Sequence, residues 1–199
     1  MKRAFTLLEL LIVIAIIAIL ALIAIPNFLE SQVRARVSRC MADVRTVGVA
    51  FQTYTVDYNT YPLNGSDFGV PNNQQVAAME RQLTTPIAYL TEWPADPFAI
   101  QPIGKNRVSY KYRAIHFWEI ANDKDRNLWG QGIFWWIDSF GPSQTSDDPT
   151  NPGKIFNTYN MITGGQPLRI YDPPNGTVSL GFIIMTNKGF YDGRMYPHS

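Results

Sequence analysis

The chain opens with an unbroken apolar segment that indicates a membrane-spanning helix. Residues 5–25 read FTLLELLIVIAIIAILALIAI and contain a single charged side chain, Glu9. A helix of this length, rising 1.5 Å per residue, covers roughly 30 Å, the thickness of a hydrocarbon core. Pro26 follows directly. A cleaved secretory signal is disfavoured for two reasons. The apolar core of such a signal is shorter than this run, and Pro26-Asn27-Phe28 offers no small-x-small cleavage site.

The helical pattern continues beyond Pro26, now with a single apolar face. Apolar residues recur every three or four positions, at Val33, Val37, Met41, Val44, Val47, Phe51 and Tyr54. Polar residues fill the positions between them, which is typical of an amphipathic helix. The sequence therefore predicts one helix from residue 5 to about residue 57. Pro26 lies where the two halves meet, and it removes a backbone hydrogen bond there, which permits a kink or local melting.

The remainder of the chain has the pattern of a small α+β domain. Residues 73–83 predict a short helix that ends before Pro86. Asn175-Gly176 predicts the tight turn of a hairpin. Alternating or continuous apolar runs predict strands at 108–116, 132–140 and 179–187. The predicted fold is α+β, with the long N-terminal helix packed on a small antiparallel sheet.

Composition narrows the possible functions. The chain is 46% hydrophobic and 17% charged, with a net charge of +1, so no basic surface suggests a nucleic-acid partner. Cys40 is the single cysteine, so an internal disulfide is excluded and packing or a metal must hold the domain together.

Enzymatic chemistry is not expected. The sequence has no G-x-S-x-G, H-E-x-x-H or P-loop motif. Its tryptophans allow two interpretations, a groove for a sugar or protein ligand, or core and sheet-face packing. They are Trp93, Trp118, Trp129, Trp135 and Trp136.

Glu9 is the least expected residue of the apolar run. A charge in mid-bilayer costs about 2.5–3.5 kcal/mol on insertion scales, so an acid there suggests a function and a partner. The alternative is that Glu9 lies near the membrane surface and reaches water. The basic residues do not decide the orientation by themselves, because Lys2 and Arg3 precede the run while further arginines follow it.

The residues around Glu9 resemble the N-terminus of the type IV pilin superfamily. A short basic leader, MKRA, stands before FTLLE and the apolar run. The resemblance implies that prepilin peptidase cuts between Ala4 and Phe5, and that Phe5 is N-methylated. Glu9 is then the fifth residue of the processed chain, and it neutralises the terminal amine of a neighbouring subunit. The family usually has Gly before the cut, where this chain has Ala4.

The resemblance also implies a domain organisation and a location. Residues 1–4 are a leader, 5–26 the transmembrane and filament-core half of the helix, 27–58 its amphipathic half, and 59–199 the globular α+β region. The chain is expected to cross the bacterial inner membrane once, with the globular region on the periplasmic or extracellular side, and then to enter a pilus or pseudopilus.

Within this superfamily, the chain is most similar to the major pseudopilins of type II secretion systems. Three segments carry the similarity: YTVDYNTYP at 54–62, YLTEWPADPF at 89–98 and IDSFGPSQTSDD at 137–148. The implied function is that of a filament subunit. Its partners are copies of itself, prepilin peptidase, an inner-membrane assembly platform with its ATPase, and membrane lipid before assembly. The alternative is a pilus-borne adhesin or DNA-uptake pilin that binds a ligand through the aromatic-rich domain.

The pseudopilin resemblance further implies a calcium site in the 139–148 loop. Calcium takes six to eight oxygen ligands from carboxylates, carbonyls and hydroxyls, which a loop of this composition offers. The implied ligands are Asp147 and Asp148, with the Ser139 hydroxyl and the Phe140 carbonyl as further candidates. The family's aspartate near Ser143 is missing here. The alternative is a solvated turn.

Overall fold

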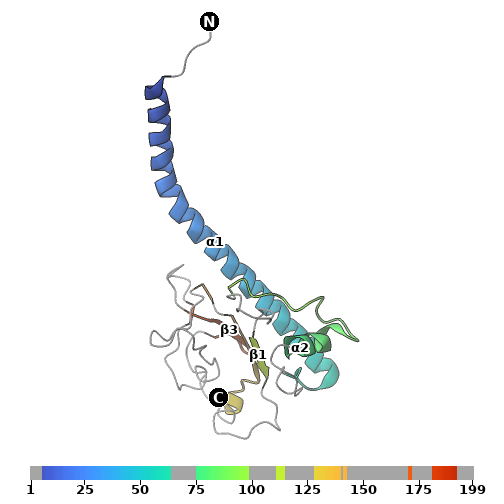
Figure 1. Ribbon diagram of the computed structural model, residues 1–199. Coiled ribbons are helices and arrows are strands. Elements are labelled where there is room, and N and C mark those ends of the chain that lie inside the picture. The colour runs from blue at the N-terminus through green and yellow to red at the C-terminus, as the bar shows by residue number, and fades with distance from the viewer. Residues whose placement is uncertain are drawn as a thin grey trace.

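A computed structural model describes residues 6–63, 75–98, 111–114, 128–139, 141–142, 170–171 and 181–191. Their elements in chain order are helices α1 (Leu7–Tyr58) and α2 (Gln75–Thr84) and strands β1 (Lys111–Ala114), β2 (Trp135–Ser139), β3 (Ile183–Thr186) and β4 (Gly189–Phe190). The N-terminal half of α1 projects away from the globular part, and its other half lies along the sheet (Figure 1). The predicted α+β architecture is confirmed.

Helix α1 runs without interruption through Pro26, close to the limits that the sequence predicts. The helix is curved rather than straight (Figure 1). It ends at Asn59, which has a left-handed conformation (φ 52°, ψ 26°) and donates its backbone N–H to Thr55 O at 2.8 Å. This cap satisfies one of the carbonyls that a helix leaves without a partner at its C-terminus.

The sheet is antiparallel, with its four strands in the order β1-β2-β3-β4. Ile137 of β2 pairs with Met185 of β3, and Met185 pairs in turn with Phe190 of β4. Strands β3 and β4 are joined through Asn187 and Lys188, before Gly189 at φ 115°. This turn was not predicted from the sequence.

The predicted Asn175-Gly176 turn lies outside the described residues, but the pairing beside it is not that of a hairpin. Ile170 and Phe182 form a parallel bridge, and the Tyr171 N–H donates to Phe182 O at 3.0 Å. A hairpin centred on residues 175–176 would pair these segments antiparallel. The pairing of Ile170 with Phe182 is thus parallel, and the Asn175-Gly176 turn itself stays a prediction.

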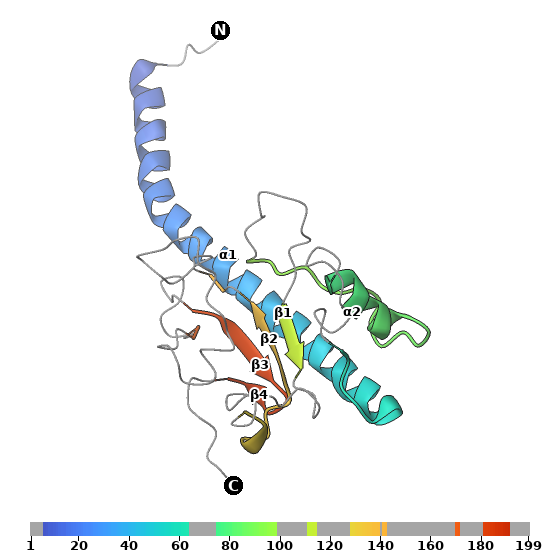
Figure 2. The same ribbon diagram turned by 60° about the horizontal axis from the view of Figure 1, so that its bottom comes forward.

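The core lies between the sheet and the amphipathic half of α1 (Figure 2). Of the predicted stripe, Val37, Val44, Val47 and Phe51 are buried, and Val33, Met41 and Tyr54 are partly buried. The ring of Phe51 stacks on Trp93 at 6.1 Å and meets Trp135 edge-on at 5.3 Å. All five residues of β2 are buried, so this strand is covered on both faces.

Gly48 allows the sheet to approach α1 closely. A methyl group at this position would come within 2.9 Å of Met185 Cε and 3.2 Å of Trp135 Cη2. Glycine costs a helix interior about 1 kcal/mol relative to alanine. The close packing of Trp135 from β2 and Met185 from β3 on the helix at Gly48 offsets that cost.

The tryptophan rings are mostly core. Trp93, Trp135 and Trp136 are at most 2% exposed. Trp129 is partly buried and packs edge-on against Phe134 at 4.7 Å, and Trp118 lies outside the described residues. Three of the five candidate ligand-binding rings are thus unavailable to a ligand, which removes their support for the adhesin alternative.

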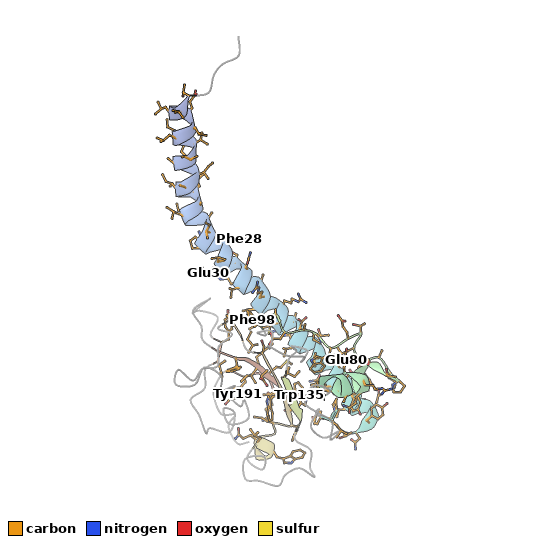
Figure 3. All side chains as sticks on the ribbon, in the orientation of Figure 1. Phe28, Glu30, Glu80, Phe98, Trp135 and Tyr191 are labelled. Carbon is orange, nitrogen blue, oxygen red and sulfur yellow. The ribbon has the colours of Figure 1, made fainter. Side chains whose placement is uncertain are left out.

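Helix α2 holds two neighbouring segments in place. The Gln82 amide accepts from the Leu63 N–H at 3.0 Å and donates to its carbonyl at 2.9 Å. Glu80 Oε1 accepts from the Trp93 N–H at 3.2 Å. Figure 3 labels Glu80 at α2, in the globular part. These bonds connect the end of α1 and the Trp93 segment to one helix.

Candidate functional site: the capped, exposed half of α1

The N-terminal half of α1 exposes its apolar side chains on every side. All large apolar residues from Leu7 to Leu29 are exposed, by 45% to 87%. The most apolar 18-residue stretch of the helix has a mean hydropathy of 3.2, and none of it is buried within the molecule. By length and composition, α1 is able to cross a membrane. Such a surface requires lipid or other protein chains to cover it.

Thr6 and Glu9 form a capping box at the start of this helix. Thr6 is the N-cap residue (φ −84°, ψ 151°), and its Oγ1 accepts from the Glu9 N–H at 3.2 Å. Glu9 Oε2 in turn accepts from the Thr6 N–H at 2.9 Å and from Thr6 Oγ1 at 2.8 Å. Two of the four backbone N–H groups that a helix leaves without partners at its N-terminus are thereby satisfied.

The capping box gives Glu9 a role within one chain that sequence reasoning missed. The readable signal was Thr6-Leu7-Leu8-Glu9, the T-x-x-E spacing that precedes apolar helices. A carboxylate in the first helical turn is also stabilised by the positive end of the helix dipole. Both hydrogen bonds use Oε2, so within the described residues Oε1 is left for a partner from another chain.

The other predicted assembly and processing residues lie on both sides of this cap. Ala4 and Phe5 are outside the described residues. Pro26 lies inside α1, within its exposed part and seven residues before Val33, the first side chain of the helix that packs against the core. The structure thus brings Thr6 and Glu9 together and places Pro26 about 25 Å along the helix from Glu9.

Of the predicted calcium ligands, Ser139 is described and is buried at the end of β2. Its hydroxyl donates to Asp96 Oδ1 at 2.8 Å and accepts from the Gly141 N–H at 3.3 Å. Asp96 Oδ1 also accepts from the Phe98 N–H at 2.9 Å. The hydroxyl therefore ties the 89–98 segment to the start of the 139–148 loop.

The remaining calcium ligands, Phe140, Asp147 and Asp148, lie outside the described residues. In the described part of the chain, no three His, Cys, Asp or Glu side chains are close enough to hold a metal. Asp96 is the residue that sequence reasoning missed, since it was noted only as part of a motif. Its oxygen chemistry suits calcium, and it lies beside the loop that carries the predicted ligands.

Comparison with known proteins finds similarity at the N-terminus and over 94 residues of the chain. The family model for the "Prokaryotic N-terminal methylation motif" matches residues 1–25. The chain is 31% identical over 94 residues to "Type II secretion system core protein G" of Aeromonas hydrophila, a match that covers 47% of this chain and 66% of the relative. No solved structure matches the chain.

The predicted resemblance to pilins and to the major pseudopilin of type II secretion is confirmed by these two matches. An apolar helix with a methylation motif, joined to a small antiparallel sheet, is the pilin-like arrangement that the sequence predicted. The chain carries the prokaryotic N-terminal methylation motif at residues 1–25 and is similar to a core protein of the type II secretion system.

Proposed function

We propose that this chain is the structural subunit of a type II secretion pseudopilus or a related type IV pilus-like filament, and that it has no catalytic role. Prepilin peptidase processes it, and an inner-membrane platform with its ATPase assembles it from the inner membrane. The globular region lies on the periplasmic or extracellular side. The methylation motif and the similarity to a secretion core protein support this proposal.

The exposed apolar half of α1 is the observation that carries the proposal. Lipid covers this surface while the chain is in the membrane. When the chain leaves the membrane, the apolar helices of other copies can cover this surface, because they have the same length and the same apolar side chains. The same segment therefore serves as anchor and as filament core, and Glu9 lies at the end where a neighbouring chain's processed N-terminus is expected.

Processing at Ala4 supplies a direct test. We expect co-expression with a prepilin peptidase to remove residues 1–4 and to leave Phe5 with a methylated amine, as mass spectrometry of the intact chain will show. Ala4→Leu should block the cut, because the peptidase requires a small residue there, whereas Glu9→Gln should be cut normally. An intact Met1, or a cut beyond Pro26, would contradict the proposal.

We further propose that the 139–148 loop binds calcium. If so, removal of calcium with a chelator should lower the melting temperature by about 5–10 °C when the ion was present near 100 times its Kd. Asp147→Asn should abolish this shift, while Asp123→Asn, in a different acidic segment, should preserve it. Thermal unfolding with and without calcium measures both. A melting temperature that calcium does not change would exclude the site.

A further inference from the structure

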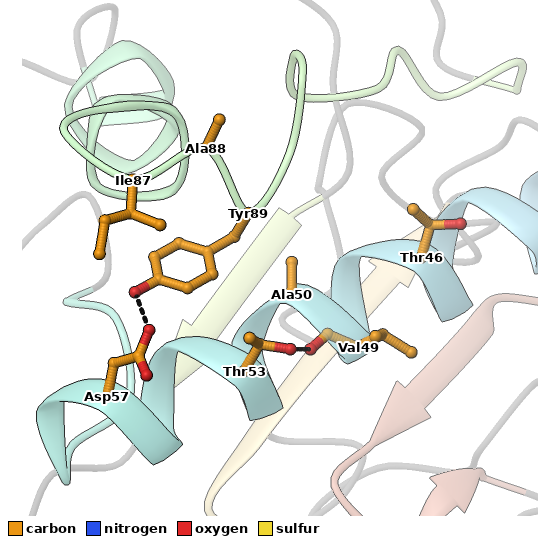
Figure 4. Close-up of a pocket in the computed structure, with 8 residues that line it drawn as sticks. All are labelled: Thr46, Val49, Ala50, Thr53, Asp57, Ile87, Ala88 and Tyr89. Carbon is orange, nitrogen blue, oxygen red and sulfur yellow. Dashed lines mark hydrogen bonds between the residues drawn. The ribbon is translucent and has the colours of Figure 1, made fainter.

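A groove of about 540 Å³ lies between α1 and the segment that follows α2. One wall is a single face of α1 that includes Val49 and Asp57, and the other wall is the segment from Ile87 to Tyr89 (Figure 4). Val49 is 60% exposed and Ile87 49% exposed. The groove thus presents apolar surface to solvent at Val49 and Ile87, while Ala50 and Tyr89 connect its floor to the core.

The end of the groove near the C-terminus of α1 is acidic. Tyr89 Oη donates to Asp57 Oδ2 at 2.6 Å (Figure 4). Desolvation raises the pKa of the Tyr89 phenol, and the hydrogen bond to Asp57 raises it further. The phenol therefore remains a donor at neutral pH, and in the described part of the chain Asp57 has no cationic partner.

A second face of α1, around the junction of its two halves, has the complementary chemistry. Phe28 and Leu29 are 63% and 55% exposed, and Phe28 lies on the projecting part of the helix (Figure 3). Arg36 is exposed and lacks an acidic partner among the described residues, whereas Arg34 and Arg39 pair with nearby acids. The i, i+3, i+4, i+7, i+11 spacing puts one set of residues on one face: Ile25, Phe28, Leu29, Gln32 and Arg36.

The two faces match when one α1 lies parallel to another with an offset of 21 residues, or about 31 Å. This offset places Phe28 beside Val49, Gln32 beside Thr53, and Arg36 beside Asp57. Apolar side chains then meet apolar ones, the amide meets a hydroxyl, and the cation meets the carboxylate. Two copies anchored through the same apolar segment have the same orientation in a membrane, so a parallel arrangement is the one available to them.

We propose that the groove binds the Ile25–Arg36 face of α1 from a second copy of this chain, with Arg36 paired to Asp57. This inference rests on the proposed filament function and specifies one of its contacts. A chain cannot fill its own groove, because the two faces lie 21 residues apart on one helix. The contact is also heterologous, so it repeats from copy to copy and builds a filament rather than a closed dimer.

Copies at equal depth in the membrane do not form this contact. Their α1 helices are in register, so the Ile25–Arg36 face of each lies about 31 Å from the groove of its neighbour. The pairing becomes possible only when one copy has moved along the filament axis relative to the other. The contact is therefore a property of the assembled filament and not of the membrane-anchored subunit.

Charge reversal tests the pairing. Arg36→Asp and Asp57→Arg should each lower filament yield by about tenfold or more, because like charges then face each other across the contact. The double variant should restore yield to within about threefold of wild type, since it re-forms the pair with opposite polarity. The matched control combines Asp57→Arg with Arg81→Asp, an exposed arginine on α2, and should not restore yield.

A cysteine pair tests the offset. A chain carrying both Phe28→Cys and Val49→Cys should give a ladder of disulfide-linked multimers when its filaments are oxidised, while buried Cys40 remains in place. Either single variant should give no ladder. The Phe28→Cys, Val56→Cys pair, which corresponds to an offset of 28 residues, should give none either.

The outcomes separate this inference from the function on which it rests. If the wild-type chain forms filaments but the double charge variant does not restore yield, the Arg36–Asp57 contact is overturned and the filament function stands. The same holds if the Phe28→Cys, Val56→Cys pair gives a ladder and the Phe28→Cys, Val49→Cys pair does not. A wild-type chain that forms no filaments under an assembly system would overturn both. Yield is measured by electron microscopy of sheared filaments, relative to the amount of subunit in the membrane.

Discussion

Replacement of Glu9 by valine is expected to abolish filament formation while the chain remains in the membrane. In a packed filament core the carboxylate has little access to water, and the methylated amine of Phe5 on a neighbouring copy is its expected partner. Removal of one member of a buried ion pair leaves the other charge uncompensated, which typically costs about 3–5 kcal/mol. Membrane insertion should be unchanged or improved, because the variant removes the single charge of residues 5–25.

The capping box requires a control that separates two roles of Glu9. Glu9→Gln retains a side chain that caps the Thr6 N–H but carries no charge. Thr6→Val keeps the charge and removes the hydroxyl of the cap, at a cost of about 0.5–2 kcal/mol of helix stability. If the charge is needed for assembly, Glu9→Gln should be as defective as Glu9→Val, and Thr6→Val should retain most filaments.

The measurement uses each variant as the sole subunit in a strain or reconstituted system that assembles the wild-type chain. Filaments are counted by electron microscopy, and the subunit is quantified in the membrane fraction. Normal filaments from Glu9→Val would show that the acid merely reaches water at the membrane surface. Normal filaments from Glu9→Gln, but not from Glu9→Val, would assign the role of Glu9 to the helix cap.

The second large effect is expected in the core. Phe51→Ala should lower the free energy of unfolding by about 3–5 kcal/mol, because it removes a fully buried ring that contacts Trp93 and Trp135. Domains of this size are stable by about 5–15 kcal/mol in total. The variant is therefore expected to lose a large fraction of its stability, although none of its surface groups has changed.

The stability measurement is best made on a shortened chain that begins at Phe28. The large apolar residues that this removes, from Leu7 to Ile25, are exposed and outside the core, so the globular part should remain folded and become soluble. Val56→Ala is the matched control, because Val56 is on the same helix but 82% exposed, and its effect should stay within about 0.5 kcal/mol. Equal urea unfolding curves for Phe51→Ala and wild type would contradict the packing described above.

Local patterns explain why α1 and α2 were predictable from sequence. The apolar run and the three-to-four-residue spacing of the apolar positions from Val37 to Phe51 report directly on helix geometry. The cap at Thr6 and Glu9 was equally local, and its T-x-x-E spacing was overlooked only because Glu9 was considered as a membrane charge. For such features, the interacting residues are within four positions of each other in the chain.

Contacts between distant segments were not predictable in this way. The bond from Ser139 to Asp96 joins residues 43 positions apart, and no periodicity reports on it. The sequence indicated a strand around Trp135 but not that both of its faces are buried, because a short apolar run has the same pattern in either case. The turn signal at residues 175–176 likewise could not exclude the parallel bridge between Ile170 and Phe182.

The sequence by itself determined the long helix, its apolar and amphipathic halves, and its N-terminal methylation motif with Glu9 inside it, because each depends on residues that are neighbours along the chain. Only the tertiary structure decided that the sheet packs closely on α1 at Gly48 and that three tryptophans, Trp93, Trp135 and Trp136, belong to the core. It also decided that α1 forms a groove with the segment from Ile87 to Tyr89. The physical reason is that burial and clefts arise where separate segments meet, and the pairing of those segments is set by the packing of the whole domain.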